Sequence, residues 1–334
     1  MARKLKATFP EEMQYWVSTL MQVSSTISHA GISRSHLMKK SILKALAYFD
    51  MFAYPLTGQE IKLFLTLSIT EERLDDALHE LQESGTIYCF EGFYTLRNEP
   101  ALISRRKNGN ARAEAMLAKA RKISSFLYWF PYVRGIGISG SLSKNFADEN
   151  ADIDFFIITQ SNRLWIARTF MHLFKKLTFI TGRQHWFCMN YYVDEHALKI
   201  SEQNIFTATE VITLVPTQGN GVLTNFFTAN NWVHEYFPNQ LPKTGTPEKP
   251  KEGFIKRSIE YCLNNKLGEK LDDYLMTVTS KRWKVKESKR RKNARGDRMG
   301  LATGKHYARP NPEFFQQKIL QLYQHKLSQI KAAE

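Results

Sequence analysis

The stretch from residue 133 to residue 194 constrains the fold most, because its pattern alternates between strand and helix. Apolar, glycine-containing residues at 133–139 predict a strand, and residues 152–159 predict a second strand with an apolar middle. Residues 164–180 have the spacing of an amphipathic helix, and residues 186–193 predict a third strand. We therefore expect an α+β core in which helices cover a mixed sheet.

Two aspartates open the second predicted strand. Asp152 and Asp154 are two residues apart, so their side chains share one face of a strand, whereas Ile153 points into the core. Mg²⁺ is commonly bound by one or two carboxylates together with the phosphate oxygens of a substrate. An Asp-x-Asp pair also occurs at solvated strand ends, so its meaning depends on what precedes it.

The first predicted strand leads into Gly140 and Ser141, where a helix is expected to begin. Gly140 lacks a side chain and would let the backbone approach a phosphate, and Ser141 offers a hydroxyl and an N–H group at a helix N-terminus. Lys144 follows one turn later and could add positive charge. This end of the strand therefore favours an anionic ligand.

The order of strand, Gly-Ser, ten residues, Asp-Ile-Asp and apolar strand resembles the signature of the DNA polymerase β nucleotidyltransferase superfamily. The resemblance covers roughly residues 133–195. It implies a polymerase β-like nucleotidyltransferase core that moves a nucleoside monophosphate from a nucleoside triphosphate to a hydroxyl acceptor, with Mg²⁺ or Mn²⁺ as cofactor. The residues that it implies are Asp152 and Asp154 for catalysis and metal binding, and Gly140, Ser141 and Lys144 for nucleotide binding.

The family usually has a third carboxylate on a following strand. In this chain Asn190 lies where that carboxylate is expected, and Asp194 at the end of the same predicted strand is the other candidate. An amide brings no charge to a metal, so Asn190 is the poorer ligand. The alternative to an enzyme is therefore a catalytically degenerate nucleotide-binding or regulatory protein with the same fold.

Four further features are weaker candidates. His172 is expected to be a packed histidine, and His185 beside the third strand has no clear preference. Glu210 in a following helix could face the cleft, although solvent is the default expectation. Residues 304–309 are basic and aromatic and could contact phosphates from an unstructured stretch.

The chain divides into four predicted parts. Residues 1–36 are expected to be a helix and linker, and residues 37–100 a winged-helix-like domain of three helices and a hairpin. Residues 101–202 would be the nucleotidyltransferase core. Residues 203–334 are expected to form a C-terminal helical region that contains a basic segment at 281–310.

The third helix of the winged-helix-like domain argues against DNA binding. This helix would enter the groove, yet phosphates repel an acidic face. Its acidic residues are Glu71, Glu72, Asp75, Asp76, Glu80 and Glu83. We expect a structural or partner-docking role for this domain.

The charge of the chain limits the kinds of partner that it can have. The formal net charge is +15, and ten Lys or Arg residues lie between residues 281 and 298, which favours an anionic partner. The acceptor could be RNA, a protein or a small molecule.

The three cysteines are far apart and form no CxxC pair. We therefore expect neither a disulfide nor a zinc site, and we expect a cytoplasmic location. We expect no signal peptide and no membrane span.

Overall fold

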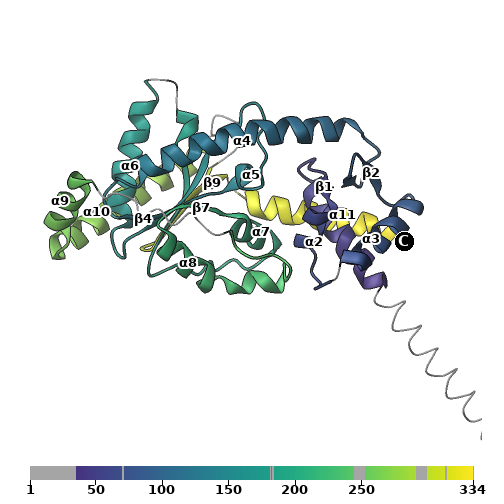
Figure 1. Cartoon of the computed structure of the whole chain (residues 1–334). Helices are drawn as coiled ribbons and strands as arrows, with labels where there is room; N and C mark the ends of the chain where they lie inside the picture. The colour runs from purple at the N-terminus through teal and green to yellow at the C-terminus, as the bar shows by residue number, and fades with distance from the viewer. Residues whose placement is uncertain are drawn as a thin grey trace, which may run out of the picture.

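The structure is a computed structural model (Figure 1). It describes residues 35–69, 71–180, 182, 184–243, 253–290, 299–312 and 314–333. The predicted N-terminal helix and residues 291–298 of the basic segment lie outside the described residues. Within them, no helix combines the length and the apolar character needed to cross a membrane.

An N-terminal module combines helices with a small antiparallel sheet. It begins with a helix over residues 35–50. The elements that follow are β1 (Leu56–Thr57), α2 (Gly58–Leu63), α3 (Glu71–Glu83), β2 (Tyr88–Phe90) and β3 (Phe93–Thr95). The strand order is β1-β3-β2, and both pairs are antiparallel. Three helices and a hairpin therefore form where the sequence predicts them.

Local sequence explains the start of α2 and the orientation of α3. The Thr57 hydroxyl accepts a hydrogen bond from the Glu60 N–H at 3.2 Å, and the Glu60 carboxylate accepts one from the Thr57 N–H at 2.9 Å, which is a capping box. On α3, Leu74, Leu78 and Leu81 are buried. The acidic residues of α3 are consequently left on its exposed face.

The main sheet is mixed and has six strands in the order β7-β4-β5-β6-β9-β8. Its strands are β4 (Val133–Ile138), β5 (Asp154–Thr159), β6 (Cys188–Asp194), β7 (Val215–Gln218), β8 (Met299–Thr303) and β9 (Tyr307–Pro312). Strands β5 and β6 run parallel, and the other neighbours run antiparallel. A parallel pair needs a crossover, which α6 (Leu164–Thr178) supplies. The expected α+β class with a mixed sheet is confirmed.

Helices cover both faces of this sheet (Figure 1). The alternation of β5 shows the two sides, because Phe155 and Ile157 belong to one apolar cluster and Phe156 and Ile158 to another. The first cluster includes residues of α4 (Ala101–Leu127), α6 and α10 (Lys266–Ser288). The second includes residues of α7 (Ile205–Thr213), α8 (Asn220–Ala229) and the N-terminal module.

The prediction that residues 203–334 form a helical region is wrong in part, because β7, β8 and β9 come from it. Residues 304–309 were expected to be unstructured, yet Tyr307 and Ala308 pair with Val193 and Tyr192 of β6. The pairing partner is more than a hundred residues away in the chain, so no local pattern reveals it. The charged helix α10 holds residues 281–288 of the basic segment.

Three smaller differences concern helices and strand ends. The sequence predicts one helix over residues 254–278, yet the structure has α9 (Phe254–Leu263) and α10 there, because the Asn265 side chain caps α10 by accepting from the N–H groups of Leu267 and Gly268. A short 3₁₀ helix (Gln184–Trp186) replaces the expected start of the third strand. His172, expected to be packed, is exposed on α6.

The C-terminal helix α11 (Phe315–Ala333) returns to the N-terminal module, as Figure 1 shows. The Tyr323 ring lies 5.8 Å from the Tyr48 ring, and the Lys326 ammonium pairs with Asp50. At the other end of α11, Gln316 donates to the Thr207 hydroxyl at 3.2 Å. The helix therefore connects α7, which covers the main sheet, with the first helix of the module.

Candidate functional site

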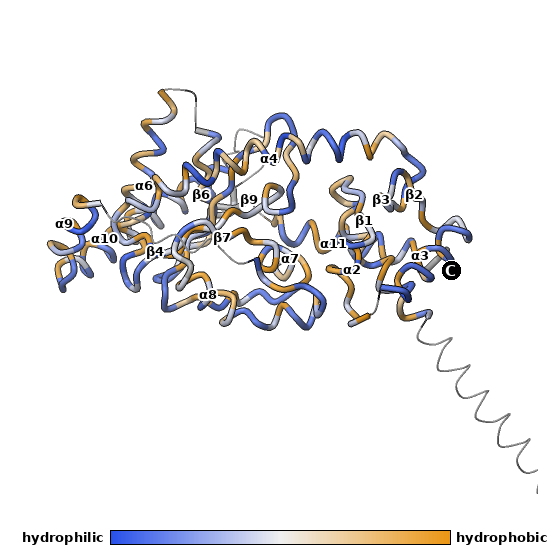
Figure 2. Tube along the Cα trace, viewed as in Figure 1, coloured by the Kyte–Doolittle hydropathy of each residue, from blue (hydrophilic) through white to orange (hydrophobic). Residues whose placement is uncertain are grey.

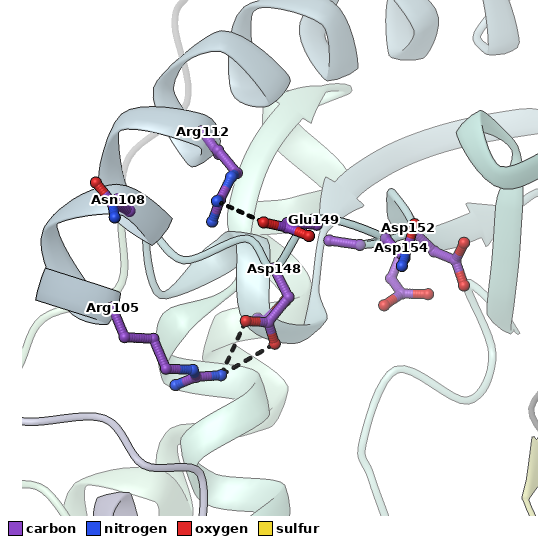
Figure 3. Close-up of a pocket in the computed structure, with 10 residues that line it drawn as sticks. Arg105, Asn108, Arg112, Asp148, Glu149, Asp152 and Asp154 are labelled. Carbon is purple, nitrogen blue, oxygen red and sulfur yellow. Dashed lines mark hydrogen bonds and ion pairs between the residues drawn. The ribbon is translucent and has the colours of Figure 1, made fainter. Parts of the chain in front are cut away.

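A pocket of about 600 Å³ lies between α4 and the segments that precede β5 (Figure 3). This volume is in the range of small-molecule sites. Polar and charged side chains dominate its walls. The residues that line it are Arg105, Asn108, Arg112, Ser141, Asp148, Glu149, Asn150, Ala151, Asp152 and Asp154. The structure thus brings Ser141 and both predicted aspartates to one pocket.

Gly140 makes the turn between β4 and the short helix α5 (Gly140–Ser143). Its φ is +69°, a left-handed conformation that favours glycine. A Cβ atom built on Gly140 would lie 2.6 Å from Oδ2 of Asp154, which is closer than such atoms can approach. The Gly-Ser turn and the second aspartate are therefore in direct contact.

The two aspartates are held by different neighbours. Asp152 precedes β5, and its Oδ1 lies 2.8 Å from Nδ1 of His185, whose side chain is mostly exposed. Asp154 is the first residue of β5, and its Oδ1 accepts a hydrogen bond from the Asn190 amide at 2.6 Å. Ile153 between them is fully buried, as its position on the strand predicts. Both carboxylates still line the pocket.

The two candidates for a third ligand lie at opposite ends of β6. Asn190 contacts Asp154, whereas Asp194 pairs in register with Thr159, at the far end of β5. The Asp194 side chain is completely buried and its Oδ2 lies 2.8 Å from Nδ1 of His306. The structure therefore places the amide beside the predicted site, and Asp194 binds the loop that leads into β9.

Lys144 does not line the pocket. Its ammonium donates to Glu210 at 2.7 Å and to the Gly140 carbonyl at 3.0 Å. The other oxygen of Glu210 accepts a hydrogen bond from the Gly140 N–H at 3.2 Å. Glu210 therefore ties the Gly-Ser turn to α7 and is half-buried rather than solvated. Sequence reasoning did not assign this role, because the partners are some seventy residues apart.

The opposite wall carries two arginines of α4 that the sequence did not point to (Figure 3). Arg105 makes a bidentate pair with Asp148 at 2.9 and 3.0 Å, and Arg112 pairs with Glu149 at 3.2 Å. Such exposed pairs contribute little stability. The sequence predicts one long helix over residues 104–129, and its basic start at residues 105–107 was the available signal for Arg105.

The donor set suits a divalent ion that also binds substrate oxygens. Among the residues that the structure describes, no three His, Cys, Asp or Glu side chains come together as a metal site. Two carboxylates on a pocket wall still match Mg²⁺, which keeps few protein ligands and takes the rest from water and phosphates. Cys188 adds no charge there, because burial raises the pKa of its thiol.

Comparison of the chain with known protein families, with curated proteins and with solved structures gives no match. The site is therefore interpreted from its own residues and geometry.

Proposed function

We propose that this protein is a metal-dependent nucleotidyltransferase with a DNA polymerase β-like core. The observation that carries the proposal is the contact between Gly140 and Asp154 at a pocket that Ser141 and Asp152 also line. A mixed sheet in which β4 and β5 are antiparallel and β5 and β6 parallel supports the same interpretation.

The proposed roles follow from position. Asp152 and Asp154 would hold Mg²⁺ or Mn²⁺, which when bound neutralises the triphosphate and supports attack by a hydroxyl. Ser141 lies on the same wall and would contact a phosphate. Arg105 and Arg112 face the two aspartates across the pocket and would meet the negative charge of the nucleotide or the acceptor.

A nucleotide-binding protein without transfer activity is the second candidate. Asn190 supports it, because the amide donates to Asp154 where a carboxylate would bring charge and basicity. An Asn190→Asp variant separates the two functions. If the wild type is an active enzyme, we expect Asn190→Asp to change its rate by no more than a few-fold. If the wild type lacks activity because the carboxylate is missing, we expect the same change to raise the residual transfer activity about 100-fold or more.

We further propose that the N-terminal module is a winged-helix-like domain used for docking or support. Its order of helix, β1, two helices, β2 and β3, with sheet order β1-β3-β2, supports this assignment. The acidic residues of α3 are exposed, which disfavours a DNA groove.

The test is transfer of radiolabel from each nucleoside triphosphate in the presence of Mg²⁺ or Mn²⁺, with cell extract as the source of acceptor. We expect transfer by the wild type and a loss of at least about 100-fold in Asp154→Ala. Asp75→Ala is the matched control and should leave transfer unchanged, because Asp75 is an exposed aspartate of α3 that does not line the pocket. Nucleotide binding without any label transfer by the wild type would refute the enzyme and favour the binding protein.

A further inference from the structure

The C-terminal half of α6 exposes large apolar side chains. Leu173 is 53% exposed and Leu177 63%, and their spacing puts them on one side of the helix, whereas Ile180, which is 85% exposed, lies just beyond the end of the helix. Phe179 at the end of α6 is 59% exposed. This end of α6 stands out from the body of the protein in Figure 1, and Figure 2 shows orange, hydrophobic segments along it between blue and pale ones.

The end of α4 extends this surface. The ring of Phe126, which is itself exposed, lies 5.0 Å from the ring of Phe174 on α6. We call the group of Phe126, Leu173, Leu177, Phe179 and Ile180 the apolar tip. Several large apolar side chains gathered on one protrusion are unusual for a protein surface and mark an interaction site.

The surroundings of the apolar tip are cationic. The sequence has no Asp or Glu between Glu114 and Asp148, and none between Asp154 and Asp194, so the second half of α4 and all of α6 lack acidic side chains. The exposed cations of these helices are Lys119, Arg121, Lys122 and Lys176.

Helix α10 adds further cations beside α6. The Arg168 guanidinium of α6 lies 4.5 Å from the centre of the Trp283 ring on α10, which fixes the two helices against each other. The exposed residues Lys281, Arg282, Lys284 and Lys286 surround Trp283 in sequence. The basic segment singled out in the sequence therefore begins next to the helix that carries the apolar tip.

We propose that the apolar tip inserts into the surface of an anionic lipid bilayer, with the neighbouring lysines on the lipid headgroups. This partner alone combines an apolar interior with a negative surface. A second copy of the chain would bring two cationic surfaces together in a symmetric contact. Single-stranded nucleic acid binds aromatic faces, which Leu173, Leu177 and Ile180 lack.

Bilayer attachment would hold the candidate pocket close to the membrane. His185 is five positions after Ile180, so an extended chain limits the distance between their Cα atoms to about 18 Å. His185 contacts Asp152 at the pocket. The proposal itself needs no transfer activity, and its test is independent of the proposed function.

The test is flotation of the full-length protein with vesicles of phosphatidylcholine alone or mixed with phosphatidylglycerol. We expect the protein to bind the mixed vesicles. Binding should be weaker at about 1 M salt, because the Debye screening length there is several times shorter than at about 0.1 M. Leu177→Glu combined with Ile180→Glu should lower binding at least about tenfold, because each apolar side chain would contribute that much on insertion. Lys176→Gln and Lys286→Gln should each lower it about fivefold.

Leu267→Glu is the matched control, because Leu267 is 66% exposed in the first turn of α10, away from the apolar tip. It should bind within about twofold of wild type. Thermal melts followed by circular dichroism establish that each variant is folded. Wild-type protein that does not float with the mixed vesicles overturns the proposal. Equal losses of vesicle binding in Leu267→Glu and in the double variant also overturn it. The same holds if the wild type does not bind vesicles and the double variant instead loses dimer formation or oligonucleotide binding.

Discussion

The absence of a Cβ atom at Gly140 determines the geometry of the turn around it. The turn has φ +69°, and Asp154 occupies the space that a Cβ would need. The N–H of Gly140 is in turn held by Glu210. The position therefore couples the backbone conformation of the turn to the placement of a carboxylate in the pocket.

Gly140→Ala should consequently damage the site more than backbone strain alone would. Its control is Gly85→Ala, since Gly85 also has φ +69° but has no atom within 4 Å of its would-be Cβ. Both variants should lose about 1–2 kcal/mol from the left-handed conformation. We expect Gly140→Ala to lose at least about 1 kcal/mol more in urea unfolding, together with nucleotide binding. Equal losses and unchanged binding would contradict the contact with Asp154.

For single residues, the local sequence pattern predicted most side-chain directions within one short stretch of the chain. Asp152 and Asp154 reach one pocket and Ile153 is buried, because strand alternation fixes their directions. Asn190 and Asp194 could not be separated, since both lie on the same strand and its register against β5 is a tertiary property. The pairing of Glu210 with Lys144 likewise depends on how α7 packs.

Between elements, the start of α6 depends on a residue of α10. Asp272 is fully buried, and its Oδ1 accepts hydrogen bonds from the N–H groups of Trp165 and Ile166 at 2.8 and 2.9 Å. Helix starts leave such N–H groups without partners inside the helix, and an acceptor from another element can replace the usual capping residue. Burial raises the pKa of Asp272, and the two N–H groups oppose that rise.

Asp272→Ala should therefore destabilise the protein by about 2–3 kcal/mol, because two buried N–H groups lose their acceptor. Asp273→Ala is the neighbouring control, since the Asp273 side chain is 52% exposed and pairs with Lys305 at the surface. The control should cost less than about 1 kcal/mol. Urea unfolding measures both changes. A cost for Asp272→Ala no larger than that of the control would show that α6 does not need this cap.

Elements with a strong internal period were predictable, and elements defined by distant partners were not. Helix α6 shows its period in sequence, and the Thr57 cap is visible as the start of α2. Strands β8 and β9 exist because β9 pairs with the edge of β6. Their basic residues, prolines and glycines resemble a loop until that edge is known.

For the molecule as a whole, α4 leaves the N-terminal module and α11 returns to it. Arg106 of α4 is buried and donates to the Pro55 carbonyl at 2.8 Å and to Glu60 at 2.6 Å. On the returning side, Tyr323 is 5% exposed, and burial raises its pKa to about 12, so the hydroxyl stays protonated. The module is thus joined to the main sheet by two helices far apart in sequence.

Tyr323→Ala should weaken the packing of α11 on the N-terminal module. Removing a buried aromatic ring that packs on Tyr48 should cost about 3 kcal/mol or more. Leu322→Ala is the matched control, because the adjacent Leu322 side chain is 44% exposed and should cost less than about 1 kcal/mol. If α11 holds the module in place, urea unfolding of Tyr323→Ala should divide into two transitions, with the module unfolding first. A single transition with the midpoint of the control would show instead that α4 alone is enough to unite the molecule.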